Sequence, residues 1–356
     1  MSLSLALSSA LSGLSVTARA TQLASDNIAN MQTEGYGVRT LSQAARVTGS
    51  EGSGVVATGI QRDIAPALLA DLRHAKSQKS QDDTRSGFWA QIEMTFGMPD
   101  EPGGLTYLID RLGVSLQNAA AQTDSDARLY QVAQATTDIA HRFGAIHDVL
   151  QSQRDMADSS LAKDVQSLNQ MLGTIAELNT KIQRQTLLGG APESLMDARQ
   201  RLIDDVASIV AVQEIPRADG RILLLGRDGS VLVDRTAAQF DFTRTLQPDA
   251  SDRVENGVLS AVTLNGRDVA PGSALFSTGR MGAFLEIRDK AAPALQQKLD
   301  NIAQDLVARF SAPAVDPTLA ADAFGLFALN GLAGLPADNT GIAAMLSLNA
   351  LADPEK

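Results

Sequence analysis

A heptad pattern near the start of the chain restricts what this protein can fold into. Apolar and small side chains recur there at alternating steps of four and three, at Leu7, Leu11, Leu14, Ala18, Thr21, Ser25 and Ile28. This spacing lines one side of a helix that is about 33 Å long, at about 1.5 Å of rise per residue. Because such a helix is marginal alone in water, we expect a second helix, from this chain or another copy, to cover the stripe. The simpler alternative is an amphipathic helix in an ordinary globular core.

A short polar motif follows this helix and is expected to turn the chain away from it. Asn30 tolerates a left-handed conformation that would end the helix, and Gly35 allows a turn that is closed to larger residues. The motif consists of Asn27, Ile28, Ala29, Asn30, Thr33, Gly35 and Tyr36. It resembles the N-terminal signature of the bacterial flagellar axial proteins, the rod, hook and hook-associated family, in which Asn-Ile-Ala-Asn precedes Thr and then Gly-Tyr or Gly-Phe. Asp26 and Glu34 depart from that signature, which commonly has Asn and Pro there.

Length and charge narrow the class of protein. A chain of 356 residues is long enough for roughly two or three domains. Its formal net charge of −11 argues against sequence-independent binding to nucleic acid or to anionic membranes. No apolar run reaches the roughly 18 residues that membrane insertion needs. The N-terminus lacks the basic region and the apolar block of a cleavable signal peptide, so we expect export, if it occurs, to leave it in place.

Residues that could carry chemistry do not converge on a site. The chain has no cysteine, which excludes disulfides and thiolate zinc sites. His141 and His147 are six residues apart, so they point to different faces of a predicted helix. Gly52 to Ala57 formally matches a dinucleotide fingerprint, but its surroundings look extended and lack the required strand and helix. We therefore expect no cofactor, no metal site and no catalytic residues, and a protein that is not an enzyme.

The rest of the pattern predicts a mainly α fold with an inserted β domain (α+β), built as a long-helix bundle plus the N-terminal heptad helix. Residues 127–188 contain no proline and predict one very long helix. Gly226 to Gly229 and Asn265-Gly266 are turn signals between short β-rich runs. The expected segments are the heptad helix and motif at 1–40, an extended arm or hairpin at 41–65, a long-helix bundle at 66–211, a small β domain at 212–278, a return helix on the bundle at 279–311 and an irregular, incomplete tail at 312–356.

The predicted return helix carries a second resemblance. Gly279 to Ala283 forms a glycine-rich turn, Arg288-Asp289 follows, and an amphipathic helix ends at Phe310. These features resemble the family of flagellar hook-associated protein 1, the junction protein between hook and filament. The long helices favour this family over the hook and rod proteins, which are largely β beyond their termini. A hook or rod protein is the first alternative, and a soluble helical-bundle enzyme is the second.

This resemblance implies a structural role, partners and a location. It implies a subunit that assembles helically at the hook–filament junction, outside the cell, after type III export. The implied partners are other copies of the chain, the hook protein, the second hook-associated junction protein and an export chaperone. The candidate assembly interface is Leu7, Leu11, Leu14, Ala18 and Ile28, and the motif residues would shape the turn out of the helix.

The end of the chain departs from this family. Its members normally finish with another heptad helix that pairs with the N-terminal one, and residues 312–356 show no such pattern. We therefore expect either a truncated chain or a partner helix supplied by a second polypeptide.

Overall fold

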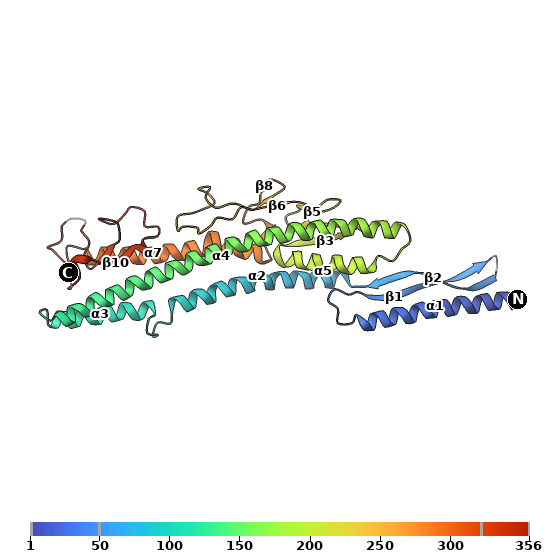
Figure 1. The fold of residues 1–356 in the computed structure, drawn as a ribbon, viewed down its shortest axis with the longest axis horizontal. Helices are drawn as coiled ribbons and strands as arrows, with labels where there is room; N and C mark the ends of the chain where they lie inside the picture. Colours follow the sequence, from blue (N-terminus) through green and yellow to red (C-terminus); the bar gives the residue numbers. More distant parts are fainter. Residues whose placement is uncertain (1–2, 49–50, 321–322, 355–356) are drawn as a thin grey trace.

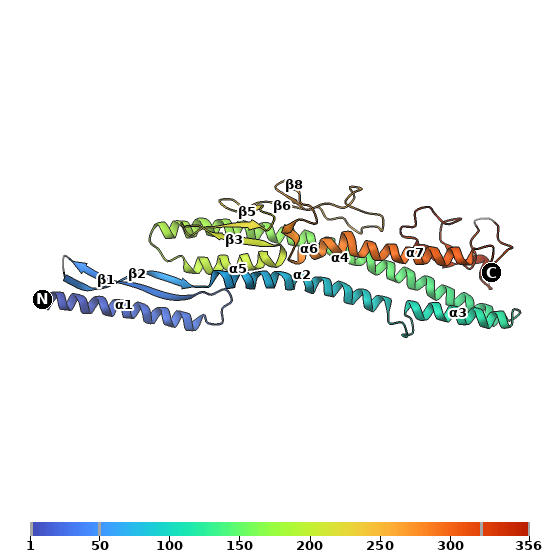
Figure 2. The same cartoon turned by 180° about the vertical axis from the view of Figure 1, so that it is seen from behind.

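The protein is an elongated helical body with an arm at one end (Figure 1). This computed structural model describes residues 3–48, 51–320 and 323–354. The N-terminal helix lies at one end of the long axis and the C-terminal segment at the other, as the reverse view also shows (Figure 2). Long helices with small antiparallel sheets make up the fold, which confirms the predicted mainly α class with inserted β elements.

The arm combines the N-terminal helix with a long hairpin. Helix α1 (Leu3–Ala29) lies along the antiparallel strands β1 (Val38–Thr48) and β2 (Glu51–Asp63). The register shifts between Ser42 and Gln43 and between Ala45 and Val47, and each shift places one extra residue on β2, which marks two bulges in that strand. The hairpin expected at 41–65 is therefore present, beginning a few residues earlier. Gly52 to Ala57 lies within strand β2 and opens no helix, which agrees with the rejection of a dinucleotide site.

The body is built on one very long helix, α4. The helices of the body are α2 (Pro66–Phe96), α3 (Leu105–Ala121), α4 (Asp126–Leu187) and α5 (Glu193–Ile209). Proline stands in the first turn of α2, where its missing N–H costs nothing. Gly97 follows α2 with a φ of 73°, a positive value that favours glycine, and the helix ends there before α3. Helices α3 and α5 contact different halves of α4.

Two hydrophobic cores succeed each other along α4. The first is built around Ile139, Phe143 and Leu150. Helix α3, the helix at 292–310 and buried residues between 327 and 346 complete it. The second is built around Leu161 and Leu172 with α5 and the β elements. All five side chains are fully buried. The buried stripe of α4 thus continues from one core into the next, while its partners change.

The inserted β elements form two small sheets on one side of α4. The first has the order β3-β4-β5 and the second the order β6-β7-β8. The strands are β3 (Val212–Pro216), β4 (Ile222–Gly226), β5 (Val231–Val233), β6 (Phe240–Asp241), β7 (Thr263–Leu264) and β8 (Arg267–Asp268). Strands β6, β7 and β8 are only two residues long. The backbone beyond β6 bonds to side chains instead of a ladder, as where Thr245 N donates to Asp158 Oδ2 at 2.8 Å.

The return segment runs as a nearly continuous helix back along α4. It consists of the 3₁₀ turn η1 (Ala274–Phe276), helix α6 (Arg280–Glu286), the π-helical turn η2 (Ile287–Ala291) and helix α7 (Ala292–Phe310). Helix α7 and η2 contact α4, as expected for a return helix on the bundle.

The C-terminal segment is more regular than the tail that we predicted. Strands β9 (Phe327–Leu329) and β10 (Leu346–Leu348) pair antiparallel, and the 3₁₀ turns η3 (Ile342–Met345) and η4 (Ala350–Ala352) flank β10. Phe327 and Ala343 are fully buried against α4 and α7. The buried carboxylate of Asp300 in α7 accepts hydrogen bonds from the backbone N–H groups of Gly341 and Ala343, at 2.9 and 3.0 Å. This tertiary anchor has no signal in the local sequence.

A buried ionic network lies where the two cores meet. Arg288, in the π-helical turn, pairs with Asp158 of α4 at 2.8 Å, and both side chains are fully buried. Asp289 pairs with the same guanidinium at 2.7 Å. Arg154, one turn earlier in α4, donates to the carbonyl oxygens of Asp249 and Asp252. Burial lowers the pKa of Arg154 to about 10. The network joins α4, the return helix and the loop after β6.

Replacing Asp158 by Ala is expected to lower the free energy of unfolding by about 3 kcal/mol, because Arg288 would stay buried with one carboxylate instead of two. The control is Asp155→Ala, one turn earlier, where the half-exposed pair with Arg244 contributes at most about 1 kcal/mol. Urea denaturation followed by circular dichroism measures both. Equal losses in the two variants would contradict a special role for the buried pair.

Candidate assembly interface

The leucine stripe predicted from the heptad pattern lies on the outer side of α1. Leu7, Leu11, Leu14 and Ile28 are 62, 58, 68 and 74% exposed. The opposite side of the helix faces the hairpin and buries its Val16 and Leu23. At 100° per residue these two sets lie about half a turn apart, so one side of α1 serves the arm and the other is uncovered. Ala18, the fifth predicted residue, is also exposed.

Small side chains let α1 lie close to the hairpin. Ser12 Oγ accepts a hydrogen bond from Val55 N at 3.1 Å and donates to the carbonyl of Ser9 at 2.8 Å. Gly54 has a φ of 109°, and a Cβ added there would collide with Ser12 Oγ. Ser9 and Ser12 thus lie at the close contact between the helix and strand β2.

Asn27 ties the end of α1 to the start of the hairpin. Its Oδ1 accepts from Tyr36 OH at 2.8 Å and from Arg39 N at 3.0 Å. Its Nδ2 donates to Arg39 O at 2.8 Å. One amide side chain therefore satisfies both backbone groups of a β1 residue, which a side chain with a single polar atom could not do.

The other motif residues shape the turn, though not all as predicted. Asn30 stays outside the left-handed region, so that prediction was wrong. Instead its Nδ2 donates to Asp26 O at 2.9 Å, and Thr33 Oγ1 donates to Asn30 Oδ1 at 3.3 Å. The carbonyl of Asp26 thus accepts from both the backbone and the side chain of Asn30, Met31 N donates to the carbonyl of Ile28, and the helix ends without a left-handed residue. Gly35 has a φ of 75°, which confirms the predicted special turn. Ile28 and Ala29 face outward.

The arm joins the body through an ionic junction that no local sequence pattern indicates. Asp197 of α5 accepts from Gly37 N at 3.1 Å and pairs with Arg39 and Arg62, both at 2.7 Å. Its side chain is 9% exposed. The guanidinium of Arg39 also lies over the Tyr36 ring, 4.9 Å from its centre. These residues are far apart in the chain and share no local pattern, so only the tertiary structure brings them together.

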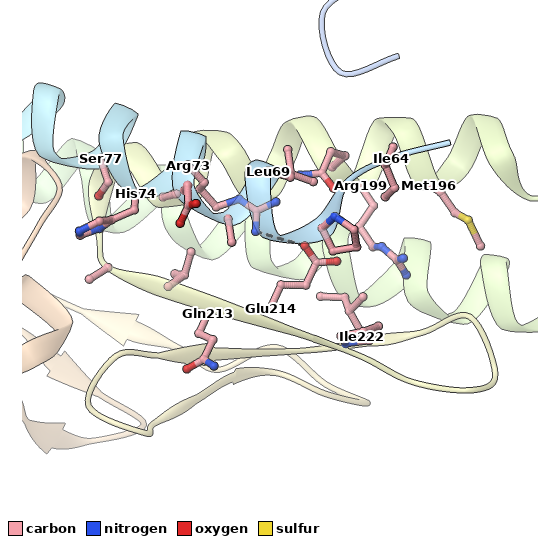
Figure 3. A pocket seen from close by; sticks show the side chains of 18 of the residues that line it. Ile64, Leu69, Arg73, His74, Ser77, Met196, Arg199, Gln213, Glu214 and Ile222 are labelled. Atoms are coloured by element: carbon pink, nitrogen blue, oxygen red, sulfur yellow. Dashed lines mark hydrogen bonds and ion pairs between the residues drawn. The ribbon is translucent and has the colours of Figure 1, made fainter. Parts of the chain in front are cut away.

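A polar pocket adjoins this junction (Figure 3). The start of α2, the helix α5 and the strands β3 and β4 line it. Arg73 of α2 donates through Nε to Asp204 at 2.8 Å and through Nη1 to Glu214 at 3.1 Å. Arg199 of α5 is buried and bonds Asn179 Oδ1 and Gly220 O. Burial lowers its pKa to about 10.

No group of three or more potential metal-ligating residues lies together within the described ranges. His141 and His147 lie on α4 in different environments, the first exposed and the second half-buried. Among the residues that the structure describes, no helix has both the length and the apolar character that crossing a bilayer would require.

A long helical body, carrying a stiff arm whose leucine stripe faces solvent, is typical of a structural subunit that assembles with others. Comparison with protein families agrees with that class. Residues 89–313 match the model of the flagellar hook-associated protein FlgK helical domain, and residues 7–36 match that of the flagella basal body rod protein. The first match spans more than half of the chain, so the protein belongs to the FlgK family of hook-associated proteins.

Individual relatives agree with this assignment. The flagellar hook-associated protein 1 of Salmonella typhimurium is 25% identical over 310 residues, which are 85% of this chain and 55% of the relative. That of Bacillus subtilis is 22% identical over 335 residues, 86% of this chain and 66% of the relative. The structure of the flagellar hook junction protein FlgK from Burkholderia pseudomallei shares the fold, with a TM-score of 0.60 at 19% identity over 73% of this chain and 47% of that one. The chain thus spans about half the length of these relatives.

Replacing Asn27 by Ala is expected to loosen the arm, because three hydrogen bonds of about 0.5–1.5 kcal/mol each are lost. Amide hydrogen exchange of the hairpin should become about tenfold faster, while that of α4 should not change. Gln22→Ala is the control, since it removes only an exposed bond to Asp26 on the same helix. Unchanged hairpin exchange in the Asn27 variant would contradict this role.

Replacing Asp197 by Asn is expected to free the arm from the body, because Arg39 and Arg62 lose their shared carboxylate. The chain has no cysteine, so spin labels attached at Gln43→Cys and Gln185→Cys, both exposed positions, report the distance between arm and body. The distance distribution should broaden in the Asp197 variant. It should not change in Asp219→Asn, whose pair with Arg221 lies within the body. Identical distributions would show that the junction does not depend on Asp197.

Proposed function

We propose that this protein is a structural subunit of the bacterial flagellum that forms the junction between hook and filament, and that it has no enzymatic role. The observation that carries the proposal is the uncovered leucine stripe of α1. Supporting it, the chain belongs to the FlgK family, and its relatives carry the names hook-associated and hook junction protein.

Assembly would proceed through the stripes. Each leucine that a neighbouring subunit covers contributes about 1.5–3 kcal/mol, so Leu7, Leu11 and Leu14 together can hold a subunit in a polymer. Contacts that repeat head to tail without closing generate a helical tube. In this arrangement α1 packs in the inner wall, with Ala18 and Ile28 extending the stripe, while the helical body and the β elements face outward.

The partners and location follow from that role. Other copies of the chain would pack beside it, the hook protein below it and the second hook-associated junction protein above it. An export chaperone would hold the subunit before type III export. The protein would act outside the cell in the flagellum and would keep its N-terminus, which the assembly interface includes.

Deletion of the gene tests the proposal. Electron microscopy of the deletion strain should reveal hooks without filaments, and filament protein should appear in the medium. Restoring the gene should restore filaments. Normal filaments in the deletion strain would overturn the proposed role.

The stripe itself is tested by changing Leu7, Leu11 and Leu14 together to Gln. Because all three are exposed, the melting temperature of the purified protein should change little. The variant gene should fail to restore filaments in the deletion strain. The control changes three other exposed leucines, Leu187, Leu188 and Leu246, to Gln, and it should restore them. Filaments at the wild-type frequency in the stripe variant would contradict the interface.

A further inference from the structure

The pocket beside the arm–body junction has the size and the charge of a ligand site (Figure 3). Its volume of about 570 Å³ lies within the range of small-ligand pockets, about 300–1,000 Å³. The acidic residues Asp71 and Glu214 contribute to its wall. The wall also contains the imidazole of His74 and a larger set of arginines, Arg62, Arg73, Arg199, Arg217, Arg221 and Arg227. The whole chain is acidic, with a net charge of −11, so this group of arginines stands out.

Arg199 is a buried positive charge that forms no ion pair with a described carboxylate, and the opposite charge that acts on it is the more distant Glu214. Its Nη1 donates to Asn179 Oδ1 at 2.8 Å and to Gly220 O at 2.9 Å, and both acceptors are neutral. No described carboxylate pairs with it, and its lowered pKa reflects the same burial. Arg217 and Arg227, which are exposed at the pocket edge, also form no ion pair with any described residue. Since a buried cation is stable only when it is paired, the wall favours an anion.

Two guanidinium nitrogens of residues that line the pocket are also without an acceptor among the described residues, and both atoms are buried inside the protein. Arg73 is buried, with Nε and Nη1 bound to Asp204 and Glu214, but its Nη2 has no partner among the described residues. Arg62 pairs with Asp197, and its Nε is likewise buried and without a partner there. Guanidinium groups match the two oxygens of a carboxylate in both geometry and charge.

The remainder of the wall is apolar. Apolar side chains line the pocket from the loop between β2 and α2 (Ile64), from α2 (Leu69), from α5 (Met196) and from β4 (Ile222). A bare inorganic anion would leave this apolar surface in contact with water. A carboxylate on a short hydrocarbon chain would place its charge near the arginines and its hydrocarbon against the apolar wall. We propose that the pocket binds a carboxylate carried on a short apolar chain. Its source is either a free aliphatic carboxylate or an acidic side chain of a neighbouring, equally acidic copy of the chain.

The first arm of the test uses glutarate, which carries two carboxylates on three methylene groups. Isothermal titration calorimetry at constant ionic strength should give saturable binding of glutarate and none of the neutral analogue glutaramide. Met196→Glu places a carboxylate in the pocket and should weaken glutarate binding at least tenfold, whereas the isosteric Met196→Gln should stay within threefold of the wild type. Arg199→Gln should also lose binding, and melting curves check that each variant folds.

The second arm distinguishes the source. Met196→Glu and Met196→Gln are each introduced into the deletion strain, and filaments are counted by electron microscopy. Loss of filaments with Glu alone assigns the site to a neighbouring subunit's carboxylate. Normal filaments with both, together with saturable glutarate binding, assign it to a free carboxylate. This filament count rests on the proposed junction function, whereas the calorimetry does not, so the two tests can fail separately.

Two results would overturn the carboxylate site. The first is heat of dilution only, or equal binding of glutarate and glutaramide, combined with normal filaments in both Met196 variants. The second is glutarate binding that Met196→Glu and Arg199→Gln leave unchanged, which would place the binding elsewhere on the protein.

Discussion

The length of α4 is the constraint on which the rest of the structure depends. The helix has 62 residues and therefore runs for about 93 Å. Its buried stripe continues along nearly the whole of that length, and no compact core can cover so long a stripe. The chain covers it in succession, first with α3, α7 and the C-terminal segment, and then with α5, α6 and the small sheets. The elongated body of Figure 1 follows directly.

The polar network at the midpoint of α4 gives this long packing a register. Arg154 and Arg288 are among the largest fully buried side chains, and they lie between one hydrophobic core and the next. An apolar replacement of such a network is often equally stable, so its benefit lies in specificity. Arg288 pairs with Asp158 on α4. Arg154 of α4 donates to the carbonyl of Arg288 in the return segment and to the carbonyl of Asp249 in the loop after β6. Sliding of the return helix along α4 would break the two bonds that join these helices, Arg288 to Asp158 and Arg154 to the carbonyl of Arg288.

The helix of the arm, α1, differs from α4 because it is covered on one side only. The side of α1 that faces the hairpin buries Val16 and Leu23 and is also held by hydrogen bonds of Ser12 and Asn27. The leucine side is thereby left free, and its exposure is a cost that only a partner can remove. Asp197 then fixes the arm on the body through two arginines, so the stripe is presented in a defined direction. The carboxylate pocket adjoins this same junction, so a ligand there would lie next to the residues that hold the arm.

Much of this architecture could be predicted from residues alone, because it depends on local rules. The heptad stripe, the long α4 and the hairpin turn at Asn265-Gly266 follow from side-chain period and backbone preference within a few residues. The conformation of Asn30 could not be predicted in this way, because its side chain donates to the carbonyl of Asp26 and the helix ends without a left-handed residue. The same holds for the ordered C-terminal hairpin and for the Asp197 junction, whose partners lie in distant segments. The sequence by itself determined which helices form and which side of α1 is apolar. Only the tertiary structure decided which side of α1 is covered and where the buried charges meet, because packing partners and burial are properties of the whole chain.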